Sequence, residues 1–197
     1  MASKKAKIID KWKSKKWYQV VAPSLFEGRE ICEVVGSDDH LLLNRVVRTS
    51  LMDLGLSASG QTGMFTTLDF RIIGVNGTVA STRLIGHTIA SSYTRTFARR
   101  GKSLIHSVVD AKTKDNEQVR IKVVAVTNGR VSATVKKNLR YAIQEEVKNI
   151  AALFTYDEFM LEILHGRISS KLFNRLKKIT MMRRAEVRKS ERKEEFK

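Results

Sequence analysis

The stretch SSYTRTFARRGKSLI, residues 91–105, gathers the residue types that could bind phosphate. Basic side chains alternate there with two aromatic ones, and no acidic residue lies among them. The basic residues are Arg95, Arg99, Arg100 and Lys102, and the aromatic ones are Tyr93 and Phe97. Three interpretations are open at this point: a phosphate-binding loop of an enzyme, a nucleic-acid surface, or a helix face whose charges are only solvated.

The tetrapeptide RGKS within this stretch resembles the end of a P-loop, whose motif is Gly-x-x-x-x-Gly-Lys-Ser/Thr between a strand and a helix. The first glycine would have to stand five residues before Gly101, where the sequence has Thr96. A helix is also expected before this segment and a strand after it, which is the reverse of the required order. The P-loop interpretation is therefore excluded.

No other group of residues predicts catalysis or metal binding. The four histidines, His40, His87, His106 and His165, lack the spacing of metal ligands, and no pair of acids suited to acid–base catalysis can be argued. Cys32 lies in an alternating pattern typical of a strand, so we expect a small core residue there. We expect no enzymatic activity, no metal, no cofactor and no small-molecule substrate.

The compartment follows from the cysteine count and from the absence of long apolar runs. A single cysteine excludes an internal disulfide, and the N-terminal residues lack the apolar run of a signal peptide. No run of about 18 apolar residues occurs, so no membrane span is expected. These features predict a cytoplasmic protein without a membrane partner.

The charge of the chain is large and unevenly distributed. The 197 residues carry a formal net charge of +17, although 42% of them are hydrophobic. Residues 1–16 hold seven Lys and one Asp (+6), residues 167–197 hold twelve Lys or Arg and four Glu (+8), and only +3 remains for the rest. Such a surplus opposes compaction unless an anionic partner neutralises it. Nucleic acid is the usual partner, and an anionic membrane surface is the next.

Three long windows of the sequence contain no acidic residue. They run between Asp69 and Asp110, between Glu117 and Glu145, and between Glu162 and Glu186. Basic residues in these windows have no acidic sequence neighbours, so either acids from elsewhere in the fold pair with them or they face an anionic partner. The overall shortage of acids favours the partner.

The pattern of the sequence is β-rich first and helical last. Short β-rich runs, WYQVV and REICEVV, come first. The pair Asn76-Gly77 between two apolar runs predicts a hairpin with a type I′ turn, and residues 114–116, KDN, predict a second hairpin. Many short antiparallel strands of this kind indicate an α+β protein whose core is a closed or nearly closed antiparallel β-barrel with peripheral helices.

Three helices are expected in the C-terminal part. After Ser132 the apolar residues follow a helical stripe. The stripe comprises Val135, Leu139, Ile143, Val147 and Ile150. Thr155 and Glu158 form a capping box that begins a second helix, which Gly166 can end. The third is marked by Ile168, Leu172, Leu176 and Ile179.

The opening stretch is placed on a further helix, near residues 88–100, with Thr88 as its N-cap. Ile89, Tyr93 and Phe97 step by four and predict a buried stripe, so the rings are expected in the core and not under bases. Arg95 and Arg99 would point outward one turn apart, where like charges repel by about 0.2–0.5 kcal/mol per pair. A phosphate backbone crossing them would reverse the sign of that interaction.

The predicted organisation is a basic N-terminal arm at 1–16, a barrel core at 17–131 that includes the basic helix, C-terminal helices at 132–182 and a basic tail at 183–197 without a clear core face. Each part carries clustered Lys or Arg, which favours RNA or DNA over a merely solvated surface. The candidate contacts are Lys4, Lys5, Lys7, Lys11, Lys13, Lys15, Lys16, Arg95, Arg99, Arg100, Lys102, Lys136, Lys137, Arg140, Lys171, Arg175, Lys178, Arg183, Arg184 and Arg188.

The order of several motifs resembles a known family. The opening KSKKWYQVVAPSLF is followed by VVRTSLMDL, SLIHSVVDAKTKDN, VRIKVVAVT, GRISSKLFNRLKKI and RRAEVRK. This order is similar to that of the S-three-A-e family of small-subunit ribosomal proteins, also called the S-one family of eukaryotic type, and to its archaeal members in length. The positions that fit the opening motif are Lys16, Trp17, Tyr18, Val20, Ala22, Pro23 and Phe26.

The sequence departs from the family pattern at three turns. Asp115-Asn116 stands where the family usually has Asp-Gly, Leu43-Asn44-Arg45 replaces a Gly-Arg, and Met181-Met182 replaces a pair that contains proline. These departures concern local turn geometry.

The resemblance implies a β-barrel with peripheral helices that binds small-subunit rRNA. It implies a place on the platform beside the 3′ region of that rRNA and near the mRNA exit, with neighbouring small-subunit proteins and possible mRNA contact. The alternative is a free-standing RNA- or DNA-binding regulator that works off the ribosome.

Overall fold

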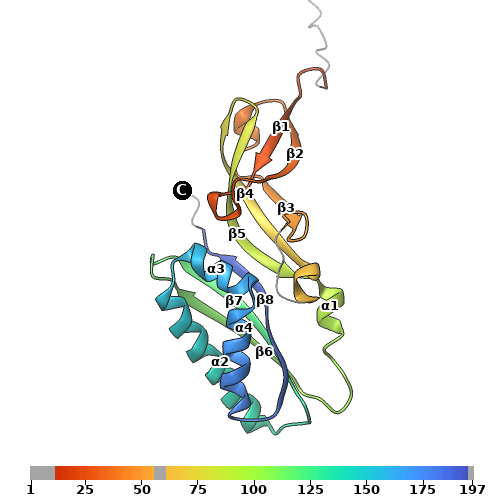
Figure 1. Ribbon diagram of the computed structural model, residues 1–197, viewed down its shortest axis with the longest axis vertical. Helices are drawn as coiled ribbons and strands as arrows, with labels where there is room; N and C mark the ends of the chain where they lie inside the picture. Colours follow the sequence, from red (N-terminus) through yellow and green to blue (C-terminus); the bar gives the residue numbers. More distant parts are fainter. Residues whose placement is uncertain (1–11, 56–60, 195–197) are drawn as a thin grey trace, which may run out of the picture. The chain divides into compact units, whose positions relative to one another are not determined.

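The computed structural model describes residues 12–55 and 61–194 and shows a mixed α+β fold (Figure 1). The strands in these ranges are β1 (Lys16–Val21), β2 (Glu30–Gly36), β3 (Val46–Ser50), β4 (Thr66–Asn76), β5 (Val79–Ile89), β6 (Leu104–Lys112), β7 (Gln118–Thr127) and β8 (Met182–Arg192). The α-helices are α1 (Ser91–Arg95), α2 (Ala133–Leu153), α3 (Tyr156–Leu164) and α4 (Arg167–Lys177). Short 3-10 turns are η1 (Ser24–Phe26), η2 (Asp39–Leu41) and η3 (Gln61–Phe65).

The strands pair in the order β2-β1-β5-β8-β7-β6, and β4 pairs with both β3 and β5. Across the described residues this path is open, so the α+β class is confirmed but the closed barrel is not. Strand β5 has different neighbours along its length. Residues 79–81 pair in parallel with β1, whereas residues 86–88 pair antiparallel with β8.

The chain divides into two compact units that are each discontinuous in sequence. The first unit comprises Met1–Val47 and Phe70–Leu84, and the second comprises Arg48–Asp69 and Ile85–Lys197. The long strands β4 and β5 contribute to both units. Each unit has its own apolar core.

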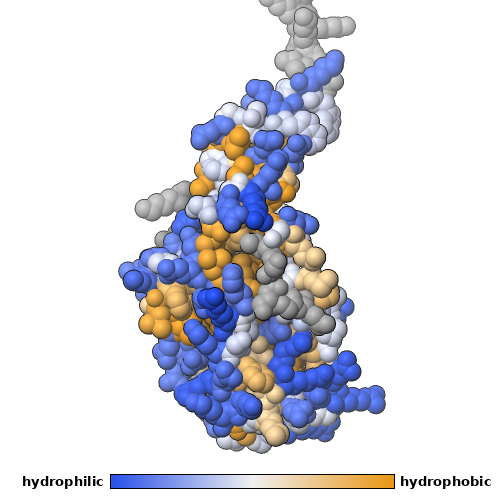
Figure 2. All heavy atoms as spheres, in the orientation of Figure 1, coloured by the Kyte–Doolittle hydropathy of each residue, from blue (hydrophilic) through white to orange (hydrophobic). Residues whose placement is uncertain are grey.

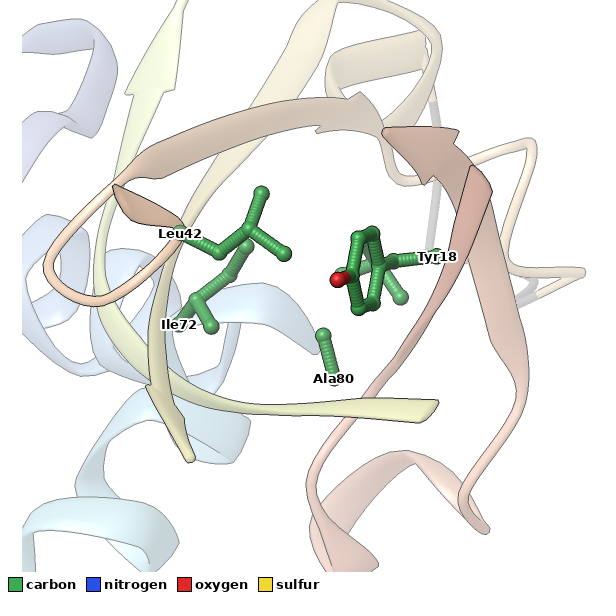
Figure 3. Packing of buried hydrophobic residues seen from close by; sticks show 5 residues of the cluster. Tyr18, Leu42, Ile72 and Ala80 are labelled. Atoms are coloured by element: carbon green, nitrogen blue, oxygen red, sulfur yellow. The ribbon is translucent and has the colours of Figure 1, made fainter. Parts of the chain in front are cut away.

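The core of the first unit gathers apolar side chains from several strands and a turn (Figure 3). Tyr18 and Ala80 come from β1 and β5, Ile72 comes from β4, and Leu42 follows η2; all are at most 2% exposed. The Tyr18 hydroxyl donates to Asp39 Oδ1 at 2.7 Å, so this buried phenol keeps a hydrogen-bond partner. Cys32 packs partly buried against the cluster, as expected for a small core residue, and burial raises the pKa of its thiol.

Both predicted hairpins are present, with a change in turn geometry. The β4–β5 turn follows Asn76, and of the pair only Gly77 has a positive φ, of 63°. A type I′ turn needs two adjacent residues with positive φ, so the predicted turn type is wrong. At the β6–β7 turn Asn116 has a φ of 60°, and Asn44 has 65°. Asparagine adopts a positive φ more readily than most residues other than glycine. This explains why asparagine can occupy these two positions, where the family pattern has a glycine.

The second unit packs helices on one face of strands β6, β7 and β8. Figure 1 shows α2 and α4 along the same side of these strands, in line with the contacts of α2 with β6 and of α4 with β8. The apolar stripe of α2 is buried as predicted, except that Val135 is half-buried. Ser132 caps α2, Thr155 and Glu158 form the predicted capping box of α3, and Gly166, with φ of 73°, separates α3 from α4.

Strand β8 corrects the prediction of a basic tail. Ala185, Val187 and Ser190 are at most 5% exposed, and β8 hydrogen-bonds to β7 on one side and to β5 on the other. The apolar residues are few and lie between long charged side chains, so the sequence pattern suggested no core face. A central strand nevertheless obtains backbone partners on both edges, which stabilises it without a long apolar run.

Candidate nucleic-acid interface

Helix α1 and the loop after it carry the basic cluster that the sequence singled out. Tyr93 and Phe97 are 7% and 6% exposed and pack with Ile89, Val124 and Val126, so the prediction that the rings belong to the core is confirmed. The ring of Phe65 stacks on Tyr93 with centroids 4.7 Å apart and an angle of 11°.

The predicted helix at 88–100 is wrong outside residues 91–95. Thr88 lies in β5, where it pairs with β8 through Lys189, and Ala90 precedes the helix without a side-chain cap. Backbone pairing of the preceding strand therefore overrides the helical period of the sequence. At its other end the helix stops at Arg95, so Arg99 lies in the loop beyond it.

The side chains of Arg95, Arg99 and Arg100 are exposed, and Lys102 is half-buried. Within residues 12–55 and 61–194 none of these four side chains makes a hydrogen bond or an ion pair. In the orientation of Figure 1, Figure 2 shows mainly hydrophilic side chains over the loop between α1 and β6. This segment presents positive charge to solvent without a counter-charge from the described fold.

Two further arginines come to this segment from β8, which is about 90 residues away in sequence. Arg184 Nη1 donates to the Tyr93 hydroxyl at 2.7 Å, and its guanidinium carbon lies 5.5 Å and 5.1 Å from the ring centroids of Tyr93 and Phe97. Its Nε lies 3.5 Å from Glu186 Oε1. Arg183 is exposed beside it.

Arg99, Arg183 and Arg184 line one cavity. Its volume is about 250 Å³, and the remaining lining residues are Tyr93, Thr96, Phe97 and Val126. Among the residues that the structure describes, no acidic side chain is part of the lining. We call these three arginines and Arg95, Arg100 and Lys102 the α1 cluster.

The basic residues of α4 behave differently. Arg175 lies 3.5 Å from Glu145 of α2, and Lys171 lies 3.9 Å from Glu162 of α3 and over the ring of Phe154. Lys178 is exposed just after the helix. Acids from neighbouring helices therefore pair with Lys171 and Arg175, which is the alternative that the sequence left open.

The basic residues at the start of α2 are intermediate between the α1 cluster and the basic residues of α4. Lys137 lies 5.8 Å from the ring centroid of Tyr141, and Arg140 Nε donates to the backbone oxygen of His106 at 3.4 Å. Lys136 is half-buried. No acid pairs with these three residues in the part of the chain that the structure describes.

The N-terminal candidates lie partly outside the described residues. Lys4, Lys5, Lys7 and Lys11 fall there. Of the others, Lys13 and Lys16 are exposed, and the Lys15 ammonium lies 3.6 Å from the ring centroid of Trp12. At the other end of the chain, Arg188 is exposed on β8.

A network of ion pairs lies at the ends of β6, β7 and β8 that are farther from the α1 cluster. Asp110 accepts from Arg120 at 2.8 Å and from Lys193 at 3.4 Å, and the hydrogen bond from Arg120 lowers the pKa of that carboxyl to about 2. Glu191 pairs with Lys122 and Lys189. These four basic side chains share two acids, so each of them has an acidic partner within the fold although a positive surplus remains.

Sequence reasoning missed a buried histidine between strands β5 and β8. His87 is 2% exposed; its Nδ1 lies 2.6 Å from Ser190 Oγ and its Nε2 lies 3.1 Å from the backbone oxygen of Val187. Burial lowers the pKa of the imidazole to about 4. Gly86 lies against the same strand, because a Cβ there would come within 2.0 Å of the Ser190 oxygen. The sequence gives no signal for this contact between β5 and β8.

Within residues 12–55 and 61–194, no helix is both long and apolar enough to cross a membrane. In the same ranges no three His, Cys, Asp or Glu side chains gather as a set that could hold a metal ion.

Clustered arginines without acid partners on a mixed α+β fold are typical of proteins that bind nucleic-acid backbones. The sequence matches the Ribosomal S3Ae family over residues 3–195, and the chain belongs to that family. The resemblance that the motifs predicted is confirmed.

Curated relatives carry the name small ribosomal subunit protein eS1 and come from archaea. The protein of Desulfurococcus amylolyticus is 37% identical over 191 residues, which cover 96% of this chain and 88% of that protein. The protein of Methanothermobacter thermautotrophicus is 34% identical over 188 residues, or 95% of each chain. That of Sulfurisphaera tokodaii is 36% identical over 188 residues, or 95% of this chain and 96% of the relative.

Proposed function

We propose that this protein is a structural constituent of the small ribosomal subunit and holds rRNA through the α1 cluster, without enzymatic activity. The observation that carries the proposal is that Arg95, Arg99, Arg100 and Lys102 have no side-chain partners among the described residues of a chain that belongs to a ribosomal family. Net charge of +17 supplies the attraction to a polyanion.

We further propose that it sits on the platform near the 3′ region of the rRNA and by the mRNA exit. Neighbouring small-subunit proteins, and mRNA at the exit, are its other partners in this proposal, and the compartment is the cytoplasm. The support for this placement is the family resemblance, together with the relatives that carry the name of a small-subunit protein.

The cluster is suited to positioning and not to base reading. The neighbouring rings of Tyr93 and Phe97 are buried, so they offer no surface on which bases could stack. The cluster itself presents guanidinium and ammonium groups. Contacts to phosphates fix register and orientation but carry no sequence information. Side chains cannot read the deep, narrow major groove of helical RNA, so backbone contacts are the expected mode.

Sucrose-gradient sedimentation of the native protein tests the proposal. We expect the protein to migrate with small subunits after a high-salt wash. If it stayed at the top of the gradient under conditions that leave the other small-subunit proteins bound, it would instead be the free-standing nucleic-acid-binding regulator.

A further inference from the structure

We infer that the cavity between α1 and β8 is a binding pocket for a single phosphate group of the RNA backbone, with Arg184 as its fixed donor. The inference rests on the proposed function and deepens it, because it assigns one built site within a surface that otherwise attracts phosphate diffusely. The lining combines Arg99 and Arg183 with Arg184, and no acid of the described part of the chain belongs to it.

Arg184 is held in place before any ligand arrives. One Nη donates to the Tyr93 hydroxyl at 2.7 Å, and the guanidinium carbon lies within cation–π distance of the rings of Tyr93 and Phe97. Tyr93 is itself fixed, because Phe65 stacks on it and Phe97 packs edge-on at 5.0 Å. A guanidinium carries five N–H donors, so after these contacts it still has donors for a bidentate contact to phosphate.

Glu186 partly balances Arg184 but does not occupy the pocket. The contact of its Oε1 with Nε is long, at 3.5 Å, and the carboxyl is also bound by the Thr62 hydroxyl at 3.1 Å. Burial raises the pKa of Glu186, which reflects how poorly its charge is solvated on that side of the strand. With Arg99 and Arg183 included, the site keeps a positive surplus.

The size and chemistry of the cavity select the ligand. A volume of about 250 Å³ is below the roughly 300–1,000 Å³ of sites for drug-sized ligands, so a small anionic group fits better than a whole nucleotide. Stacking of a base is disfavoured because Phe65 and Arg184 already lie against Tyr93. Planar guanidinium groups match the geometry of phosphate oxygens, which makes arginine the residue of choice for such a site.

The test uses the full chain and titrates it at fixed ionic strength with inorganic phosphate, with the dinucleotide UpA and with glutamate, monitored by amide chemical shifts. UpA holds one phosphodiester and no terminal phosphate, so it separates a backbone phosphate from a terminal or free one. Glutamate reports on an acidic protein segment as the occupant. We expect saturable shifts near Tyr93, Thr96 and Arg184 with phosphate and UpA, and weak, unsaturated shifts with glutamate.

Arg184→Lys keeps the charge but loses the planar fork, and Arg167→Lys is its control at an exposed arginine of α4 that pairs with Glu162. Loss of a charge-assisted bidentate contact should weaken phosphate and UpA binding about tenfold or more in Arg184→Lys, and less than twofold in Arg167→Lys. Tyr93→Phe, which removes only the hydroxyl that orients Arg184, should weaken binding by a few fold. It keeps the inference testable if Arg184→Lys does not fold, as circular dichroism would reveal.

Equal behaviour of Arg184→Lys and Arg167→Lys would overturn the pocket, as would glutamate binding as tight as phosphate. If Arg184→Lys lost phosphate and UpA binding but kept the affinity of the wild-type protein for an rRNA fragment, the assignment to the RNA backbone would be wrong. Failure of the protein to sediment with small subunits, with the Arg184-dependent binding of UpA intact, would overturn the proposed function and leave the phosphodiester pocket standing.

Discussion

The α1 cluster and the basic face of α4 are similarly basic in sequence, but they differ in the acidic partners that the fold brings to them. Both lie in windows without acids, yet Lys171 and Arg175 find Glu162 and Glu145 on neighbouring helices. Arg95, Arg99 and Arg100 find no acid in the described part of the chain. Charge in the sequence therefore does not by itself separate the two regions, whereas charge that the fold leaves uncompensated singles out the α1 cluster as the candidate interface.

The largest effect should come from removing the strand pairing that supports the α1 cluster. In Gly86→Ala the new Cβ would meet the Ser190 backbone oxygen at 2.0 Å, and backbone cannot move aside cheaply. We expect the free energy of unfolding to fall by about 3–5 kcal/mol, with RNA binding lost alongside the fold. Urea denaturation measures this change.

Gly129→Ala is the control, because its Cβ would meet nothing within 4 Å. It should change the free energy of unfolding by no more than about 0.5 kcal/mol. Similar effects of the two substitutions would show that β8 is not held against β5 in the way described.

Acid should lower the free energy of unfolding, because His87 is buried in its neutral form between β5 and β8. The pKa of His87 in the fold is about 4, below its ordinary value of 6.5, because burial disfavours the charged imidazole. The unfolded chain thus binds the proton at higher pH than the fold does. The contribution of neutral His87 to the free energy of unfolding is fully present above pH 6.5. It is lost as the pH falls towards 4, by about 3 kcal/mol in all.

Urea denaturation at several pH values between 7 and 4 measures this loss, with His87→Gln as the reference. The variant separates His87 from Glu186, whose raised pKa contributes in the opposite sense. Arginines do not titrate in this range, so a loss of RNA affinity between pH 6.5 and 4 would come from the fold beneath the α1 cluster. An equally steep pH dependence in His87→Gln would rule out the histidine as its origin.

Charge reversal compares the two regions directly. Arg95→Glu with Arg99→Glu should lower the slope of log affinity against log salt by roughly 1.4–1.8, because each phosphate contact contributes roughly 0.7–0.9. The loss should be about equal for RNA fragments of different sequence. Lys171→Glu with Arg175→Glu changes the net charge equally, but we expect a smaller fall in the slope.

Filter binding or fluorescence anisotropy between low and moderate salt gives both slopes. Equal slopes for the two double variants would abolish the distinction between the regions. A loss confined to one RNA sequence would contradict the positioning role of the α1 cluster.

The smallest effect concerns the ion pairs of the α4 face. Glu145→Gln removes the exposed partner of Arg175 and should cost no more than about 1 kcal/mol of stability, since exposed ion pairs contribute little. It should also release a cation, so we expect RNA affinity to rise slightly. Thermal melting and anisotropy check the two effects, and an RNA affinity that falls would contradict the compensation argument.

Much of the helical part could be predicted from the sequence, since its signals are local. The capping box of Thr155 and Glu158 and the stripe through Leu139, Ile143 and Val147 involve residues three or four apart, and the structure contains both. The positions of the hairpin turns were predicted as well. The predicted type I′ turn was wrong, because Gly77 has a positive φ but Asn76 does not. The family followed from the order of motifs along the chain.

The tertiary structure decided the rest, because the interactions concerned join residues far apart in sequence. Strand β8 looked like a basic tail and became a central strand only through its pairing with β5 and β7. The same pairing brought Arg184 to Tyr93 and Ser190 to His87. The sequence determined how much positive charge the protein carries, and the fold determined which of those charges an acid neutralises, since pairing depends on distance in space.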